Sequence, residues 1–322
     1  MLRLSPAGNA RLEQARTLAV HVAGTESNTL ACLSRLGMRC AWLSALPSNP
    51  LGRLVAGELE SHGVSTSHVV WCGDPIARLG TYWVEEAPAP LGTQVVYDRA
   101  HSAIASLDPS AIEPSVIDTA RLLHLTGITP ALSPQARTIF HRHINRARER
   151  NVPISFDVNY RAKLWTAQEA ARELEEPCHA ADLLFCTRSD AAELWGLTGD
   201  PASVLTAMSD RFGHGNTEKS LVLTLGAEGS AQLRRGEYTH APAYPTAGTA
   251  RFGSGDAFAA GYLYAFLDGS HYVTLRDELG LTPLHFGNAT AALKRCIEGD
   301  IAIVTPHEVL SVLRGGQNAR FR

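Results

Sequence analysis

Short apolar runs alternate with amphipathic segments along most of the chain. Five apolar runs bounded by turn residues are typical of buried strands: Cys40–Leu46, Leu122–Leu125, Pro153–Val158, Asp182–Cys186 and Leu221–Leu225. Apolar residues at every third or fourth position predict helices over Thr25–Leu36, Leu51–His62, Pro134–Arg150, Asp190–Trp195, Pro201–Phe212, Asp256–Leu267 and Leu284–Cys296. Strands that alternate with helices predict an α/β fold with a mainly parallel sheet covered on both faces. In such folds, ligands bind beyond the carboxyl ends of the strands.

One region has no helix in its pattern. Three extended segments, Val69–Cys72, Leu79–Glu85 and Gln94–Asp98, are separated by turns rich in Gly, Pro and Asp. An antiparallel excursion from an α/β core predicts a lid over the ligand site. We expect this lid to comprise residues 72–103, completed by residues 9–20, and to be inserted in a single domain that spans residues 1–322.

Composition and charge exclude several classes of protein. The chain has 322 residues and 45% hydrophobic content, enough for one large folded domain. Its formal net charge of −3 gives no overall attraction to nucleic acid or to an anionic membrane. No apolar run reaches the ~18 residues that span a bilayer, and the N-terminus has no signal-peptide core. We therefore expect a cytoplasmic protein with no nucleic-acid or membrane partner.

The cysteines and histidines do not form a metal-binding pattern. The six cysteines include no C-x-x-C pair, and the thirteen histidines include no H-x-x-x-H pair. We expect reduced cysteines and no structural transition metal.

The strongest candidate for chemistry is the segment Gly253-Ser254-Gly255-Asp256. The two glycines permit a tight turn, and the helix that follows begins with N–H groups that have no partner within the helix. Such a helix start favours an anion. The Asp256 carboxylate could remove a proton from a hydroxyl that attacks the anion, which is the logic of phosphoryl transfer to an alcohol. Taken alone, the segment is better explained as a glycine turn with Asp256 as an ordinary helix cap, because short glycine motifs recur by chance.

The longer string Arg251–Gly261 resembles the C-terminal signature of the ribokinase-like (PfkB) sugar kinases. In 2-keto-3-deoxygluconate kinases the signature reads D-R-x-G-x-G-D-[AS]-F-A-A-G, and this chain matches from Arg251 onward with Ala250 in place of the first Asp. The similarity extends from Met1 to about Leu313. It implies a three-layer α/β/α core with a mainly parallel central sheet and a small β-sheet lid. It also implies ATP-dependent phosphorylation of the terminal (6-) hydroxyl of 2-dehydro-3-deoxy-D-gluconate.

The resemblance assigns a role to each part of the signature. Asp256 is the base, and the amides from Gly253 to Asp256, including those of Ser254 and Gly255, stabilise the transferring phosphoryl group. In the resembled kinases the Asp at the position of Ala250 helps to bind a monovalent cation, so its loss removes a support for that cation. The donor is ATP with Mg²⁺.

The acceptor side is implied by three further matches. Ala23-Gly24-Thr25-Glu26-Ser27-Asn28 is similar to the sugar-binding G-G-x-x-x-N. Tyr97 and Arg99 share one face of a strand, where a phenol and a guanidinium suit a carboxylate. Taken alone they are better explained as ordinary cross-strand pairs, but the resemblance implies that this Y-x-R strand contacts the sugar acid. Asp157–Trp165 matches D-x-N-x-R-x-x-[LM]-W in full. The implied substrate-binding residues are Gly24, Asn28, Tyr82, Tyr97, Arg99, Ile128, Arg161 and Asp256.

The nucleotide side depends on weaker patterns. The resemblance implies that ATP contacts Asn159, Arg161, Thr187, Gly226, Gly229, Gly253, Gly255 and Asn288. Where the resembled kinases have N-x-x-E, this chain has Thr187 and Asp190. Asp190 either organises Mg²⁺ through water or is a carboxylate favoured at a helix start, and the sequence supports both equally.

Three further expectations concern the whole protein. Met1–Pro6 resembles the second half of the first strand of the family's central sheet, so either the chain start is incomplete or that sheet begins short. We expect a homo-oligomer, a dimer or higher, formed through the lid. The alternatives are a kinase for another sugar, such as fructose or a dehydro-deoxygluconate isomer, and a sugar-acid-binding protein with weakened catalysis.

Overall fold

The computed structural model describes residues 1–8, 10–87, 90–213 and 215–315, so residues 9, 88 and 89 of the expected lid lie outside it. Within these residues a six-stranded sheet has the order β14-β13-β12-β11-β10-β9. Four strands are parallel: β9 (Leu123–Thr126), β10 (Ile154–Asp157), β11 (Leu183–Thr187) and β12 (Ser220–Thr224). The hairpin of β13 (Ser230–Arg234) and β14 (Glu237–Ala241) adds an antiparallel edge. The predicted mainly parallel sheet is confirmed.

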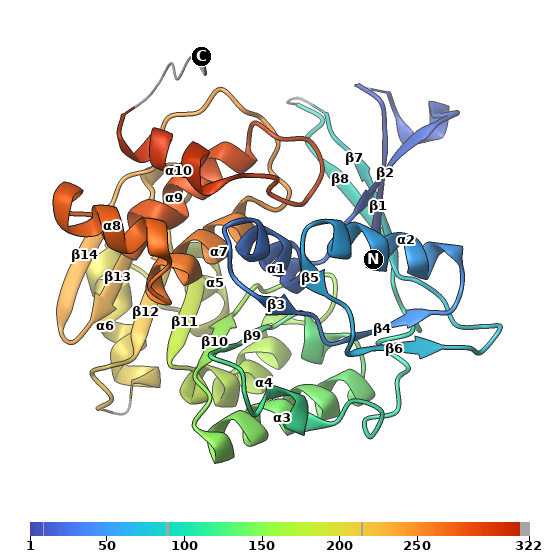
Figure 1. Cartoon of the computed structure of the whole chain (residues 1–322), viewed down its shortest axis with the longest axis horizontal. Helices are drawn as coiled ribbons and strands as arrows, with labels where there is room; N and C mark the ends of the chain where they lie inside the picture. The colour runs from blue at the N-terminus through green and yellow to red at the C-terminus, as the bar shows by residue number, and fades with distance from the viewer. Residues whose placement is uncertain (9, 88–89, 214, 316–322) are drawn as a thin grey trace.

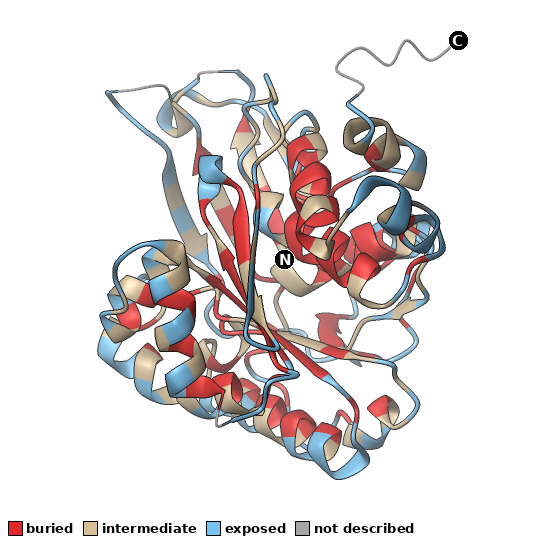
Figure 2. Cartoon of the chain, turned by 90° about the vertical axis from the view of Figure 1, so that its left-hand side faces the viewer, coloured by how far each residue is buried: buried red, intermediate tan, exposed pale blue. Residues whose placement is uncertain are grey.

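Helices cover both faces of this sheet because its strands are apolar on both sides. In β11, Leu184 packs into one hydrophobic cluster, and its neighbours Leu183 and Phe185 pack into another. The first cluster lies beneath α3 (Pro134–Arg150), α4 (Ala167–Ala180), α5 (Arg188–Trp195) and α6 (Pro201–Phe212). The second lies beneath α1 (Thr25–Arg35), α7 (Ser254–Phe266), α8 (Ser270–Leu279), α9 (Pro283–Lys294) and α10 (Pro306–Leu313). Figure 2 shows the buried residues gathered on the strands and these helices.

A second sheet forms the lid at one side of the core (Figure 1). It contains β1 (Leu2–Pro6), β2 (Leu18–Val22), β7 (Thr81–Glu85) and β8 (Gln94–Asp98), in the order β2-β1-β7-β8. Because β1 pairs with β2 and β7, the expectation that Met1–Pro6 begins the central sheet is wrong. The boundaries of the lid and the single-domain division stay predictions.

The predicted strand Cys40–Leu46 is divided into two. β3 (Cys40–Ala41) pairs with β5 (Val64–Ser65), and β4 (Ser44–Pro47) pairs with β6 (Val69–Cys72). The chain therefore changes its pairing partner between residues 41 and 44. The segment Val69–Cys72 is parallel to β4 and does not belong to the lid sheet. The expectation that it forms part of the antiparallel lid excursion is therefore wrong. α2 (Pro50–Ser61) connects β4 to β5, capped by the Asn49 side chain.

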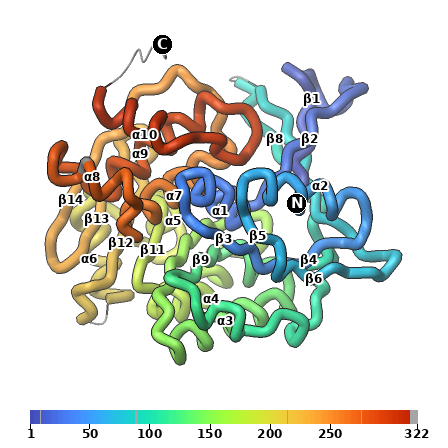
Figure 3. Tube along the Cα trace, viewed as in Figure 1, coloured from blue at the N-terminus to red at the C-terminus, as the bar shows by residue number. Residues whose placement is uncertain are grey.

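Helices from opposite ends of the chain meet at the centre of the molecule. α7 packs between α1 and α9 (Figures 1 and 3), and its residues Ala257–Ala265 are all buried. This burial explains why α7 is apolar around its whole circumference. Short 3-10 turns occur at Leu12–Gln14, Pro114–Ile117, Thr129–Ala131 and Gly226–Glu228. None of the described helices is both long enough and apolar enough to cross a membrane.

Candidate active site

The first turn of α7 has the geometry of an anion site. Gly253 precedes the helix with φ +76°, and a Cβ there would overlap the carbonyl oxygen of Asp300. Only glycine fits this position without movement of the neighbouring loop. The first backbone bond of the helix joins Ala257 N to Gly253 O at 2.9 Å. In the described part of the chain, the N–H groups of Gly255 and Asp256 have no acceptor, and a Cβ at Gly255 would meet open space. Two donors are thus available to an anion.

The Asp256 carboxylate is oriented by the start of α1. The Thr25 hydroxyl donates to Oδ1, and Asn28 Nδ2 donates to Oδ2 at 2.7 Å. Gly24, with φ +151°, begins this helix, so the N-termini of α1 and α7 meet at the carboxylate. Burial raises the pKa of Asp256, while the hydrogen bonds from Thr25 and Asn28 oppose that shift. A carboxylate with a raised pKa is a stronger base than an exposed one, which suits proton removal from a hydroxyl.

A second carboxylate lies beside the first. Asp157 ends β10, and burial raises its pKa to about 7, with further upward contributions from Asp256 and Asp190. Asn159 Nδ2 donates to Asp157 Oδ2 at 3.2 Å and to Thr25 Oγ1 at 3.0 Å, which links the loop after β10 to α1. Carboxylate oxygens are the ligands that Mg²⁺ prefers, and the mutual repulsion of these carboxylates would be relieved by a divalent cation.

Two guanidinium groups, Arg99 and Arg161, lie near each other on different segments of the chain. Arg99 follows β8 and is buried; its Cζ lies 4.0 Å from the centre of the Tyr97 ring, and its Nη2 has no hydrogen-bond partner among the described residues. Burial lowers the pKa of Arg99, and the charge of Arg161 lowers it further. Arg161 is exposed, and its charge lowers the pKa values of Asp157, Asp190 and Asp256. The two cations are therefore near each other, Arg161 is near the carboxylates, and Arg99 has a donor left for an anion.

The family model for pfkB family carbohydrate kinases matches residues 3–306. The chain belongs to the pfkB family of carbohydrate kinases. It is a sugar kinase, as the glycine-rich signature predicted, and a binding protein without catalysis is not supported.

Three relatives show how far the similarity extends. A Haloferax volcanii protein named 2-dehydro-3-deoxygalactonokinase is 38% identical over 98% of this chain and 95% of its own length. A 2-dehydro-3-deoxygluconokinase of Thermoproteus tenax is 31% identical over 91% of this chain and 86% of its own. The crystal structure of 2-dehydro-3-deoxygluconokinase from Thermotoga maritima superposes with a TM-score of 0.87 at 28% identity, covering 98% of this chain and 96% of that one. The three-layer architecture with its lid is therefore confirmed as that of the family.

Two residues predicted to contact ligands, Tyr82 and Asn288, form hydrogen bonds within the protein. The Tyr82 hydroxyl donates to Asp300 Oδ1, so its proton is used within the protein. The ring stacks on Tyr97 with centroids 5.7 Å apart. The Asn288 amide donates to the carbonyl oxygens of Ala241 and Pro242 at 2.9 and 3.1 Å and accepts from Ser230. Both side chains thus bind neighbouring parts of the protein in this structure, and their predicted contacts with sugar and ATP stay predictions.

The structure gives the positions of the other predicted site residues, whose roles stay predictions. Thr187 caps α5, because its Oγ1 accepts from Asp190 N at 2.9 Å. Asp190 lies in that first helical turn, as a helix-start carboxylate would, and also raises the pKa of Asp157. Gly226 (φ +63°) has open space around it, whereas a Cβ at Gly229 would overlap the carbonyl of Ala241. Ser254 Oγ donates to Arg251 O at 2.9 Å, and Ile128 is half-buried after β9.

Sequence reasoning missed side chains that hold the kinase site together. The Thr25 hydroxyl joins Asp256 to Asn159, and Glu26 Oε1 accepts from Thr126 and Thr129 at 2.8 and 2.7 Å. Both residues stood inside the G-x-x-x-N motif, but their partners lie about a hundred or more positions away. No local pattern predicts such pairs.

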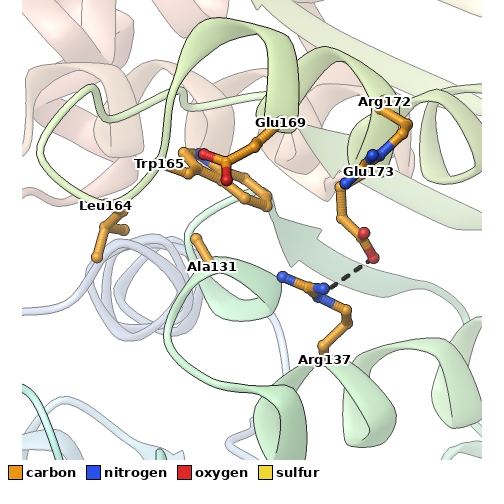
Figure 4. A pocket seen from close by; sticks show the side chains of 7 residues that line it. All are labelled: Ala131, Arg137, Leu164, Trp165, Glu169, Arg172 and Glu173. Carbon is orange, nitrogen blue, oxygen red and sulfur yellow. Dashed lines mark ion pairs between the residues drawn. The ribbon is translucent and has the colours of Figure 1, made fainter.

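A surface pocket of the kinase lies apart from these residues (Figure 4). Its lining residues come from the 3-10 turn Thr129–Ala131, α3, α4 and the loop before α4: Ala131, Arg137, Leu164, Trp165, Glu169, Arg172 and Glu173. Arg137 and Glu173 form an ion pair of 3.3 Å within it. No residue that contacts Asp256 lines this pocket.

The raised pKa of Asp157 predicts a pH-dependent stability. In the unfolded chain this carboxyl has a pKa of about 3.9, against about 7 when folded. The folded protein thus keeps a proton that the unfolded chain loses, so stability falls as pH rises from about 4 to about 7. Asp157→Asn is expected to raise the free energy of unfolding at pH 8 by at most about 4 kcal/mol, and by much less at pH 4.5. Urea unfolding at both pH values measures this.

Asp200→Asn is the control for that experiment. Hydrogen bonds from Ser203 lower the pKa of Asp200, so its loss should give no gain at pH 8. A stability gain from Asp157→Asn that does not grow with pH would contradict the prediction.

Proposed function

We propose that the kinase transfers the γ-phosphoryl group of ATP to the terminal (6-) hydroxyl of a six-carbon 2-dehydro-3-deoxy sugar acid. The observation that carries this is Arg99: a buried guanidinium whose Nη2 has no partner among the residues that the structure describes, near a second cation at Arg161. A buried unpaired donor on a charged group is costly unless a ligand completes it. The carboxylate of a sugar acid does so, whereas a neutral ketose offers no charge.

The residues divide the reaction among them. Asp256 accepts the proton of the attacking hydroxyl; the new O–P bond forms at that oxygen as the bond from phosphorus to the β,γ-bridging oxygen breaks, and ADP leaves. The N–H groups of Gly255 and Asp256 stabilise the charge on the transferring group. Mg²⁺, when bound, neutralises the charge of the phosphates, and Asp157 and Asp190 are the carboxylates that would hold it, through water. Closure of the lid excludes water and so prevents hydrolysis of ATP.

The named relatives suggest the acceptor. We expect 2-dehydro-3-deoxy-D-gluconate and its C4 epimer, the galactonate, as substrates. The galactonate should be turned over at least as fast, because the Haloferax volcanii relative named for it shares 38% identity, against 31% for the Thermoproteus tenax relative. Association of copies through the lid and a cytoplasmic location stay predictions.

A coupled assay of ADP release tests the proposal. The panel contains both epimers, 5-dehydro-2-deoxygluconate, fructose and ribose, each with ATP and Mg²⁺. We expect kcat/KM for the two 2-dehydro-3-deoxy acids to exceed that for either neutral sugar by about 100-fold, the value of one charge-assisted pair. A higher kcat/KM for fructose or ribose would show that the acid assignment is wrong.

Replacing Arg99 separates acid recognition from catalysis. Arg99→Met should lower kcat/KM for the sugar acids about 100-fold, mostly through KM, because it removes the buried cation. Turnover of a neutral sugar should change little. The matched control is Arg78→Met, which removes an exposed arginine of the lid region that pairs with Asp98. An equal loss for acids in both variants would count against a role for Arg99 in recognition.

A further inference from the structure

Lys294 is a buried cation that the proposed reaction does not use. It is the last residue of α9, and its side chain is fully buried. Its Nζ donates to the carbonyl oxygen of Ile297 at 2.9 Å, which is its only hydrogen bond to a described residue. The C-terminal end of a helix favours a positive charge, so the position suits an ammonium group.

Comparison with a second buried lysine, Lys219, shows that Lys294 has unusually few hydrogen-bond acceptors. Lys219 Nζ donates to three carbonyl oxygens, those of Cys178, His179 and Phe212. Lys294 has one carbonyl in place of three. Burial lowers the pKa of Lys294, and the carboxylates of Asp300 and Asp256 oppose this shift. The guanidinium of Arg3, which pairs with Asp300, lowers the pKa of Lys294 further, so two buried cations share these carboxylates.

The loop of residues 295–300, to which Lys294 is bound, packs against the segment that forms the anion site. Ala250 N donates to the carbonyl oxygen of Arg295 at 3.1 Å. The first residue of the loop is therefore bound to the residue just before the signature segment Arg251–Gly261. The carbonyl of Asp300, the last residue of the loop, fills the space where a Cβ of Gly253 would lie. The ammonium of Lys294 is therefore bound to a loop that contacts, at both of its ends, the segment that carries the N–H donors.

We propose that the Lys294 ammonium is the fixed cation of this active site and that phosphoryl transfer by this kinase needs no bound monovalent cation. The residues present do not fit such a cation: Ala250 supplies no carboxylate, and a bound cation would be repelled by the ammonium in the adjoining loop. Lys294 acts as a positioning residue. It holds loop 295–300 against the turn at Gly253 and stabilises the ionised form of Asp256.

The first test uses the unaltered kinase. Turnover is measured in KCl, NaCl and tetramethylammonium chloride at equal ionic strength, with whichever sugar of the panel is accepted, so the test depends on the proposed function only for its substrate. We expect rates within about 2-fold of one another. The midpoint of thermal unfolding in the same salts needs no substrate and should be the same in all three. A rise in rate or midpoint that is specific to K⁺ would overturn the inference, whereas a failure of the proposed function would show as no sugar acid being turned over in any salt.

The second test replaces the lysine. Lys294→Met should lower kcat by about 10- to 100-fold with a smaller change in KM, as losses of supporting residues do. In Lys294→Ala, K⁺ or ammonium should restore part of the rate, although neither affects the unaltered kinase. The control, Lys219→Met, should lose thermal stability while the folded fraction keeps its kcat and its indifference to K⁺. If Lys294→Met keeps its kcat, or if Lys294→Ala gains nothing from any small cation, Lys294 is only structural.

Discussion

Asp256→Asn is expected to lower kcat by about 10³-fold with little change in the binding of either substrate. The substitution removes the proton acceptor and leaves the shape of the side chain intact. General-base catalysis by a positioned carboxylate contributes about 10²- to 10⁴-fold. Because burial raises the pKa of Asp256, this carboxylate is a stronger base than an exposed aspartate. Its replacement therefore removes more of the driving force for proton removal.

The Asp256→Asn variant should stay folded, because the groups around residue 256 can hydrogen-bond to an asparagine. Thr25 can donate to the new Oδ1 as it does to the old one. Asn28 presents an amide nitrogen to Oδ2, and its own Oδ1 is buried with no partner in the described part of the chain. Rotation of the Asn28 amide by half a turn would offer that oxygen to the new Nδ2. A buried acceptor that is now unsatisfied would then be satisfied.

Three measurements separate loss of the base from loss of the fold. We expect coupled-assay turnover to fall, KM to change by less than about 3-fold, and ligand-induced thermal stabilisation by the sugar acid to persist. Lid closure and binding do not need the base, so the last two are retained. A variant that keeps more than about a tenth of the original kcat would show that another group removes the proton.

The sequence predicted the parts of the fold that depend on local pattern. β11 and β12 are apolar on both faces, which is the pattern of a buried parallel strand, and both were found within one residue of their predicted bounds. The division of Cys40–Leu46 could not be predicted, because the change of partner depends on the positions of β5 and β6, about 25 residues later. The pairing of β1 with β7 depends on a contact nearly 80 residues away.

The candidate site shows the same limit. Gly253 and Asp256 were evident because their chemistry is written in adjacent residues. The partner of Tyr82 was not, because Asp300 lies over 200 positions away and had no motif of its own. Lys294 gave no signal either: at the end of a helix, a lysine is normally a solvated residue, and only burial shows otherwise. Spatial pairs between distant segments account for the residues that the sequence left unassigned.

Gly253→Ala is expected to lower both stability and turnover, through two separable effects. The first is backbone strain, since Gly253 has φ +76°, where a Cβ costs about 1 kcal/mol. The second is overlap of that Cβ with the carbonyl oxygen of Asp300. Because a backbone atom cannot rotate away as a side chain can, loop 295–300 must move, and overpacking of this kind costs about 1–3 kcal/mol more.

Movement of that loop would disturb the network behind the anion site. Asp300 pairs with Arg3 at 2.8 Å, between Nε and Oδ2, and accepts from Tyr82. A shift of Asp300 would loosen both and let the N–H donors of Gly255 and Asp256 move. Loss of one such donor costs about 10²- to 10³-fold in kcat, and we expect a fall of that size here.

Gly236→Ala is the matched control, because its φ of +75° is nearly the same and no atom lies within 4 Å of its Cβ position. It should lose only the strain, about 1 kcal/mol, and keep its kcat. Urea unfolding and the coupled assay, run on both variants, therefore isolate the overlap with Asp300. If Gly253→Ala is no less stable than Gly236→Ala and turns over as fast as the unaltered kinase, the packing of loop 295–300 against the anion site is not a feature of this protein in solution.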